Sequence, residues 1–300
     1  MIKLSVCLTT YNRAPLLDRT LASLASQTRI PDELIISDDC STDDTEEAVK
    51  RWAGRFPRVR YNRNEQNLNM PGNLNRAISF AQGEYIANLH DADEYDPTLL
   101  EKWEGALDAF PSAGFVFCGI RGWQHFTRFG DGVILHDVEP LTNGRDFFER
   151  HFLHKLSSIV WGTVMARRSA YSEILPFDPA YGFISDVDMW LRMCEKWDVA
   201  YVREPLILLD FSPSPWRNFR WDRFELGRKI QLANIHRFFS SQPDRLHKEL
   251  KRHRLIVQQF YFRRLLGRVY HRDWTGLFEG LRICRELGLP LRWLGAFAND

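Results

Sequence analysis

The first third of the chain alternates short apolar runs with longer amphipathic ones. Four short runs have the length of strands: the mostly apolar residues 4–8, 33–37 and 85–89, and residues 58–61 around Val59. Leu17, Leu21 and Leu24 stand at helical spacing after the first strand. Further helical runs pass through Ala48 to Trp52 and over 74–81. This alternation predicts an α/β fold with a doubly wound, mostly parallel central sheet flanked by helices.

Polar segments follow three of these strands. They have the sequences TTYNR at 9–13, SDDCSTD at 37–43 and DADE at 91–94. Ligands of open α/β sheets bind beyond the carboxyl ends of the strands. Three polar clusters at one such edge therefore indicate a ligand site rather than ordinary solvated turns.

The third cluster contains Asp91 and Asp93, separated by one residue. Alternation along a strand puts two such side chains on the same face. Their carboxylates repel each other unless a cation lies between them, and Mg²⁺ or Mn²⁺ typically uses one or two carboxylates plus substrate phosphates. The pair predicts a divalent cation and a diphosphate. An Asp-x-Asp motif alone is common, so the prediction depends on the other two clusters.

Together these motifs resemble glycosyltransferase family 2 over roughly residues 3–212. The resemblance implies a GT-A fold, a nucleotide-sugar donor and inversion of the anomeric centre. Residues 157–168 resemble the strand before the acceptor site of that family. The motifs in order are TTYNR at 9–13, SDDCSTD at 37–43, Asn75 ahead of GEYI at 83–86, DAD at 91–93, and DVDMWLR at 186–192.

The resemblance also implies roles for the matching residues. The nucleotide pocket would be lined by Thr9, Tyr11, Arg13 and Asn75. Asp39 would accept a hydrogen bond from the base, and Asp91 would contact the ribose or a metal-bound water. Asp93 would bind Mn²⁺ or Mg²⁺, with Asp91 as a second candidate ligand.

Asp186 and Asp188 open a helix in the later motif. Carboxylates at a helix start cap free N–H groups, and Asp188 is expected to do only that. By resemblance, Asp186 is the general base that deprotonates the acceptor hydroxyl. Trp190 and Leu191 are expected to anchor the helix in the core.

The chain departs from the family pattern at three places. Ser185 precedes Asp186 where the family usually has Glu, and Glu94 replaces a frequent third Asp with retention of charge. After residues 203–206 many members have a metal-binding histidine, which is missing here. Water, Asp210 or Ser212 would then complete the metal site.

Composition indicates an ordinary globular protein, with 44% apolar and 26% charged residues. No apolar run reaches the roughly 18 residues of a membrane span. The start leads directly into the first strand, so we expect no signal peptide. Five scattered cysteines suggest reduced thiols in a cytoplasmic protein, with Cys7 and Cys118 as small core residues.

The C-terminal region differs in charge from the rest. Residues 216–300 contain 18 Lys+Arg and 8 Asp+Glu, a net charge of +10, against 22 and 31 elsewhere, a net −9. We expect a GT-A domain at 1–215, with a nucleotide-binding half at 1–95 and an acceptor half at 96–215. Residues 216–300 would form a basic, aromatic-rich helical appendage.

Two interpretations of this appendage remain open. Its aromatic side chains can pack on the catalytic domain while its basic side chains face water, and we slightly favour this interpretation. Such a packed appendage could also build an oligomer. Alternatively, basic amphipathic helices can dock on anionic lipid head groups, here at the inner face of the membrane. Nucleic-acid binding is disfavoured, because nothing resembles a recognised fold for it.

The sequence thus predicts an inverting glycosyltransferase of polysaccharide biosynthesis. A sugar would move from a nucleotide-diphosphate donor, UDP before others, to a hydroxyl of a glycan or lipid-linked acceptor. A nucleotidyltransferase is the weaker alternative, because such enzymes usually have a Gly-rich phosphate loop and residues 9–16 contain no glycine. Ser185 and the missing histidine leave a third alternative, a non-catalytic sugar-nucleotide-binding or scaffold protein.

Overall fold

The computed structural model describes residues 2–122, 132–155, 158–160, 162–174, 176–209 and 221–289. It divides into two compact units. The first comprises Met1–Phe152 and Ser157–Ser214, and the second comprises Leu153–Leu156 and Pro215–Asp300. The candidate metal-site residues Asp210 and Ser212 lie outside the described residues.

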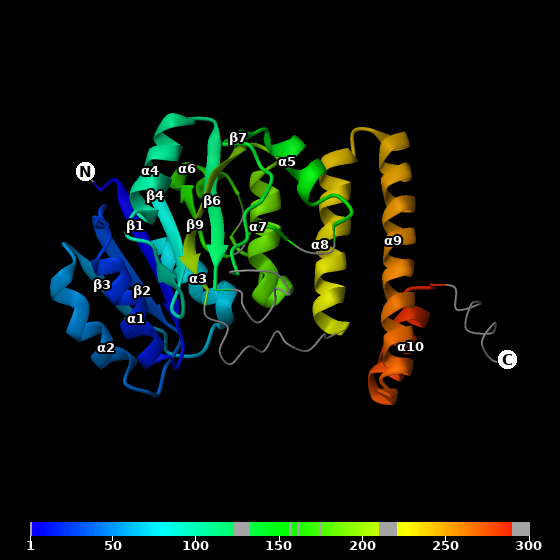
Figure 1. Cartoon of the computed structure of the whole chain (residues 1–300), viewed down its shortest axis with the longest axis horizontal. Coiled ribbons are helices and arrows are strands. Elements are labelled where there is room, and N and C mark those ends of the chain that lie inside the picture. The colour runs from blue at the N-terminus through cyan, green and yellow to red at the C-terminus, as the bar shows by residue number, and fades with distance from the viewer. Residues whose placement is uncertain are drawn as a thin grey trace, which may run out of the picture. The chain divides into compact units, whose positions relative to one another are not determined.

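The first unit is built on one mixed sheet (Figure 1). Among the described residues its strand order is β3-β2-β1-β4-β8-β6-β9-β5, and β7 pairs with β9. The strands are β1 Leu4–Thr10, β2 Glu33–Asp38, β3 Val59–Arg63, β4 Tyr85–His90, β5 Glu94–Tyr95, β6 Ala113–Arg121, β7 Leu141–Thr142, β8 Val164–Arg167 and β9 Asp198–Leu208.

Most central pairings are parallel, which confirms the predicted α/β class. β1 pairs in parallel with β2 and β4, β2 with β3, and β6 with β9. β8 is inserted between β4 and β6 and is antiparallel to both. The start of β8 therefore lies beside the carboxyl end of β4. The segment before β8 is thus brought to the edge of the sheet that carries the polar clusters.

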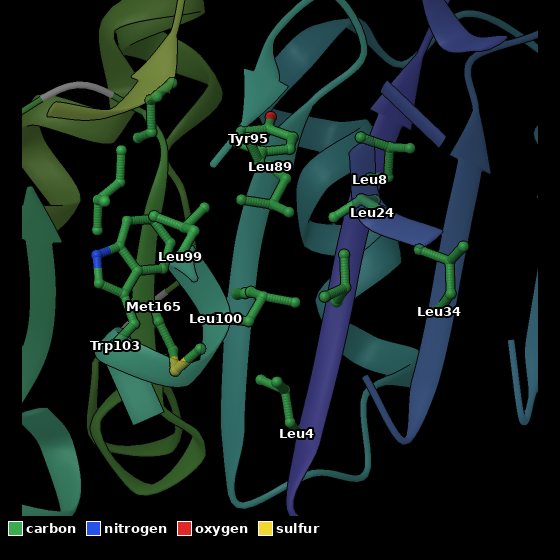
Figure 2. Packing of buried hydrophobic residues seen from close by; sticks show 14 of the residues in the cluster. Leu4, Leu8, Leu24, Leu34, Leu89, Tyr95, Leu99, Leu100, Trp103 and Met165 are labelled. Atoms are coloured by element: carbon green, nitrogen blue, oxygen red, sulfur yellow. The ribbon is translucent and has the colours of Figure 1, made fainter. Parts of the chain in front are cut away.

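Helices cover both faces of the sheet (Figure 1). Strand alternation turns Leu4 and Leu8 of β1 towards Leu24 of α1 and towards α4, as Figure 2 shows. Cys7 turns the other way and packs with Ala77 of α3, so its predicted burial is confirmed, as is that of Cys118. The helices are α1 Ala14–Ala25, α2 Thr45–Trp52, α3 Asn69–Phe80, α4 Leu99–Ala109, α5 Gly144–His151, α6 Arg168–Glu173 and α7 Ser185–Met193, with short 3₁₀ turns at Ala53–Arg55 and Pro179–Ile184.

Three predicted element bounds were wrong. α3 begins at Asn69 rather than at residue 74, because Pro71 in a first helical turn removes an N–H that needs no partner there. β1 continues to Thr10, so the polar Thr9 is still part of the strand. The strand expected over 157–168 is limited to Val164–Arg167.

The second unit confirms the predicted C-terminal helical appendage. It contains α8 Trp221–Phe239, α9 Pro243–Tyr270 and α10 Trp274–Glu286, and both α8 and α10 pack against α9 (Figure 1). The ring of Trp221 stacks on Tyr261, with centroids 5.1 Å apart. Across the described ranges, no helix is long and apolar enough to cross a membrane.

Candidate active site

The three polar segments lie at the carboxyl ends of the adjacent strands β2, β1 and β4 (Figure 1). Register fixes their relative positions, since Thr9 of β1 is opposite both Ser37 of β2 and His90 of β4. Thr9 is half-buried in this row, whereas Tyr11 is 48% exposed just beyond it. The predicted convergence of these segments is therefore found in the structure.

The turn after β1 is tied to the turn after β2. Asn12 takes a left-handed conformation, with φ of 51°, which its short polar side chain tolerates. Its N–H donates to Ser41 Oγ at 2.9 Å, and its Oδ1 accepts from the Thr42 N–H at 2.7 Å. Asp43 accepts from the Ala14 N–H at the start of α1 at 3.0 Å. These bonds give the first turn a fixed shape and orient Arg13, which follows Asn12.

Arg13 forms an ion pair with Asp91. Its Nη1 lies 3.0 Å from Asp91 Oδ1, and it bridges the ends of β1 and β4. The Asp91 side chain is buried, whereas that of Arg13 is half exposed. Burial raises the pKa of the Asp91 carboxyl, and the positive charge of Arg13 acts against this rise. The exposed part of the guanidinium faces solvent and can contact an anionic ligand.

Side chains of α1 hold the backbone of the acidic loop. Arg19 Nη2 donates to the Ala92 carbonyl at 2.9 Å, and the Thr20 hydroxyl donates to the Asp93 carbonyl at 2.7 Å. Asp93 is buried, with 5% of the residue exposed. Its Oδ2 lies 3.6 Å from Nδ1 of the His90 ring. Glu94 pairs instead with Arg19, at 3.1 Å. Asp93 and Glu94 therefore have different surroundings although they are neighbours.

His90 lies at the centre of this edge. The Tyr95 hydroxyl accepts from the His90 N–H and donates to the His90 carbonyl, both at 2.9 Å, which fixes the end of β4. Burial disfavours a charged imidazole, but the attraction of Asp93, and then of Asp186 and Asp91, outweighs it and raises the pKa of His90. The imidazole is therefore a positive or hydrogen-bonding partner shared by several carboxylates.

Gly162, just before β8, brings Asp186 to the same place. A Cβ added at Gly162 would lie 2.6 Å from His90 Nε2 and 3.2 Å from Asp186 Oδ2. The first distance is too short for any real side chain, so the imidazole and the carboxylate approach each other only across a glycine. Asn88 of β4 holds this segment by donating from Nδ2 to the Gly162 carbonyl at 2.9 Å.

Asp186 lies in the first turn of α7, as predicted. Its Oδ1 accepts from the Val187 N–H at 2.8 Å. Burial raises the pKa of Asp186 to about 6, and the Val187 N–H and the positive charge on His90 act against a larger rise. A carboxyl group with a pKa near the working pH can take up a proton and release it again, which is what a general base requires.

Asp39 occupies a separate network at the end of β2. Its Oδ1 accepts from the Leu68 N–H at 2.7 Å and from Asn64 Nδ2 at 3.1 Å. The neighbouring Asp38 is used for structure, because it accepts from the Ser41 N–H and the Tyr61 hydroxyl. The adjacent Asp38 and Asp39 thus have different partners.

Two candidate residues, Asn75 and Asp188, make their contacts outside the cluster. Both ends of the Asn75 amide bind the backbone of Phe177, at 2.8 and 2.9 Å. Asp188 does not cap α7: its Oδ2 pairs with Arg192 Nε at 2.7 Å in the core, because the helix turns it inward four residues before that arginine. Asp210 lies outside the described residues. The burial of Trp190 and Leu191 is confirmed.

The donor set at the edge fits a divalent cation. Two buried carboxylates, Asp91 and Asp93, and the imidazole of His90 offer oxygen and nitrogen atoms, a mixture that Mn²⁺ accepts. Within the described ranges, no group of three or more His, Cys, Asp or Glu side chains is placed so that it could hold a metal ion by itself. A cation here would therefore need oxygen atoms from a ligand, as expected for a phosphate-bound ion.

Sequence reasoning missed His90 and Gly162. His90 had a signal, because it is a titratable residue at the end of the strand that carries Asp91. Gly162 had none, because its importance depends on β8 entering antiparallel beside β4. Only the tertiary fold brings the two together.

Comparison with known proteins gives a consistent result. Residues 5–175 match the family model described as glycosyl transferase family 2. The putative glycosyltransferase EpsE of Bacillus subtilis is 28% identical over 65% of this chain and 67% of its own length. The putative colanic acid biosynthesis glycosyl transferase WcaA of Escherichia coli is 24% identical over 93% of this chain and 97% of its own length.

Solved structures show the same fold. The crystal structure of S. aureus TarS 1-349 in complex with UDP has a TM-score of 0.62, 18% identity, and matches over 78% of this chain and 66% of that chain. The mannosyltransferase PcManGT of Pyrobaculum calidifontis, in complex with GDP-Man and Mn²⁺, has a TM-score of 0.55 and 17% identity over 96% and 87%. The architecture is that of the GT-A fold.

Proposed function

The chain belongs to glycosyltransferase family 2, and we propose that it is an inverting enzyme that moves a sugar from a UDP-sugar to a hydroxyl of a glycan or lipid-linked acceptor. The observation that carries this proposal is the approach of His90 and Asp186 across Gly162, with Asp93 beside His90 and the Arg13–Asp91 pair at the same edge. One edge of the sheet combines a cation and diphosphate site with a carboxyl group that can act as a base.

The donor would lie along the ends of β2, β1 and β4. Asp39 at the β2 end accepts a hydrogen bond from the base, and Thr9 and Tyr11 line the pocket between base and diphosphate. The half-exposed guanidinium of Arg13 can donate to the diphosphate while it remains paired with Asp91. UDP is favoured because TarS was solved with UDP, although the GDP-Man of PcManGT makes the base a point to be tested.

Asp93 would hold the cation, and Asp91 and the imidazole of His90 are the other candidate ligands. A divalent cation at this place neutralises the charge that develops on the departing diphosphate. His90 would then supply a nitrogen ligand in place of the histidine that is missing after residues 203–206. Thr20 and Arg19 keep the acidic loop in position. Mn²⁺ should serve better than Mg²⁺, because imidazole is a poor ligand for Mg²⁺.

Asp186 would remove the proton of the acceptor hydroxyl. The acceptor oxygen then forms its bond to the anomeric carbon as the bond from that carbon to the diphosphate breaks on the opposite face. The proton ends on Asp186, and the sugar is inverted in a single displacement with no covalent intermediate. The pKa of about 6 leaves Asp186 ionised at neutral pH and ready to accept the proton.

Family membership argues against a nucleotidyltransferase. The raised pKa of Asp186, which suits a general base, argues against a non-catalytic scaffold. The name of WcaA supports a place in polysaccharide biosynthesis. A lipid-linked acceptor would fit attachment of region 216–300 to an anionic membrane. Self-association is also compatible with transfer but is not needed for it.

The test is release of nucleotide from a panel of UDP- and GDP-sugars, with Mn²⁺, with Mg²⁺ or with a chelator. We expect slow hydrolysis of one UDP-sugar in Mn²⁺ and little in the chelator. A protein that binds a donor but never cleaves it, with any cation or acceptor extract, would be a scaffold. Cleavage unaffected by the chelator would remove the cation from the proposal.

A further inference from the structure

Large apolar side chains are exposed at the end of α9 and the start of α10. Tyr270 is 82% exposed, Trp274 54% and Phe278 68%. Leu266 and Val269, in the last turns of α9, are also exposed. We call these five residues the tip surface. Single exposed apolar residues are normal, but five within thirteen positions, three of them aromatic, form a patch that calls for a partner.

The tip surface is not a missing part of the core of the helical unit. α10 already turns a separate face inward, where Gly280 meets Trp221 and Leu265 so closely that a Cβ would lie 2.4 Å from the Trp221 ring. Leu277, Ile283 and Cys284 are buried on that face. Trp274 and Phe278 follow one another at i and i+4 on a different face. Their exposure is therefore a property of a helix that is already packed.

Basic side chains surround the patch. Arg282 and Arg285 continue the stripe of Trp274 and Phe278 along α10, at i+8 and i+11, and are exposed. Arg263 and Arg264 are exposed one turn before the tip on α9, and Arg272 is exposed in the turn. Over residues 221–289 there are 15 Lys+Arg and 7 Asp+Glu. Arg282 pairs with Glu286, with Nη1 3.6 Å from Oε1, and Glu279 is exposed beside Phe278. The net positive charge around the apolar centre therefore comes from Arg263, Arg264, Arg272 and Arg285.

We infer that the tip surface is a docking surface for an anionic membrane. Trp and Tyr favour the boundary between water and lipid, where the ring is apolar and its polar edge is hydrated. Arginines beside them attract anionic head groups. A second copy of this chain fits less well, because a two-fold contact would bring the same positive rims together. This inference names the surface that the proposed membrane attachment would use, but it does not depend on glycosyl transfer.

The experiment is flotation of the full chain with vesicles of phosphatidylcholine alone or with 30% phosphatidylglycerol, at low and high salt (on the order of 0.05 and 0.5 M, chosen for Debye lengths above and below 10 Å). We expect binding only to the anionic vesicles and release by salt. Trp274→Ser with Phe278→Ser should weaken binding by about tenfold per ring. Arg263→Gln with Arg264→Gln should weaken it by about fivefold per charge.

Controls separate the tip from general stickiness. Leu135→Ser, at an apolar residue of the first unit with 43% exposure, should bind vesicles like the unchanged protein. Circular dichroism must show that the helix content of each variant is unchanged. Binding that ignored lipid charge, or that the Trp274 and Phe278 changes left intact, would overturn the inference.

Other occupants give different results. If the tip joins two copies, the ring variants change the molar mass in solution and leave flotation unchanged. If it holds an acidic protein, vesicles are ignored under every condition. Nucleotide release from a water-soluble donor reports the proposed function separately. A chain that floats but does not cleave donors would lose the proposed function alone, and one that cleaves but does not float would lose only this inference.

Discussion

The two units distribute their polar and apolar residues in opposite ways. In the first, buried acids such as Asp91 and Asp93 gather at one edge of the sheet, and large apolar residues such as Trp103 and Trp190 are buried in the core. In the second, Trp274 and Phe278 are outside, whereas the polar His253 is 2% exposed within the unit. The charges differ as well, −9 for residues 1–215 and +10 for 216–300.

This contrast indicates different roles for the two units. A parallel sheet places the ends of distant segments side by side, and that suits a site built from single residues of several strands. A pair of long helices cannot do this, but it presents continuous stripes, which suit a broad surface. We therefore propose that the first unit serves chemistry and the second serves contact. Changes in one unit should leave the property of the other intact.

The largest loss is expected from Asp93→Ala. Removal of the proposed cation ligand should lower transfer by more than about 10³-fold, because several kcal/mol of charge neutralisation would be lost. Mn²⁺ binding, followed by the signal of free Mn²⁺ in electron paramagnetic resonance, should weaken in parallel. Vesicle flotation should not change.

Glu94→Gln is the matched control for Asp93→Ala. It removes a neighbouring carboxylate that pairs with Arg19 at the surface, and should leave Mn²⁺ binding and turnover almost unchanged. Equal losses in the two variants would mean that the whole acidic loop, rather than Asp93, carries the effect.

Asp186→Asn should cost about 10³-fold in transfer, within the usual range for a general base. Donor affinity should persist, because the residue faces the acceptor side. Since burial raises the pKa of Asp186 to about 6, kcat/KM should fall about tenfold per pH unit below pH 6 and level off above it. The Asp186→Asn variant should lose this fall of kcat/KM at low pH.

Asp188→Asn provides the contrast within the same helix turn. It breaks the buried pair with Arg192, so we expect a lower melting temperature with near-normal turnover per folded molecule. If Asp188→Asn kept its stability and lost turnover while Asp186→Asn did not, the two roles would be exchanged.

Gly162→Ala should lower transfer by about 10- to 100-fold. The new methyl group would collide with His90 Nε2 and press on Asp186 Oδ2, and small misplacements of reacting groups are costly. UDP affinity should change little, because Asp39 and Arg13 follow other strands, β2 and β1. Gly54→Ala, at an open site in the same unit, is the control. A fully active Gly162→Ala would show that His90 and Asp186 need not approach each other.

The last prediction affects stability rather than transfer, and it concerns the helical unit. Burial, helped by the positive charges of His154 and Arg228, lowers the pKa of His253 to about 4. Between pH 6.5 and 4 the unfolded chain binds a proton that the folded one does not, so stability falls as pH falls, by up to about 3 kcal/mol. Glu249, whose Oε2 lies 2.7 Å from His154 Nε2, faces the same cluster.

His253→Phe should remove this dependence without loss at pH 8, because both ring nitrogens of His253 are buried without a hydrogen-bond partner within the described residues. Thermal melts and amide exchange in α9, at pH 5 and 8, measure it. His247→Phe, at an exposed histidine of the same helix, should retain the pH slope. An unchanged slope in His253→Phe would assign the acid sensitivity to another group.

Much of the first unit was predictable because its signals are local. The strand that ends at His90 and the helix that begins near Asp186 are each marked by a few consecutive residues, and both were placed within a few positions. Asp188 was misjudged for the same reason. A carboxylate at a helix start looks like a cap in the sequence, and only the packed helix shows Arg192 beside it.

The sequence by itself determined the α/β class, the edge at which the polar clusters meet, and the opposite charges of the two parts. These follow from periodicity, from the rule for strand ends and from composition, none of which needs long-range detail. The tertiary structure alone decided that β8 runs antiparallel into the sheet, so that Gly162 lets His90 approach Asp186. It also decided which aromatics of the helical unit are inside and which are at the tip, because helix packing, and not spacing, selects the buried face.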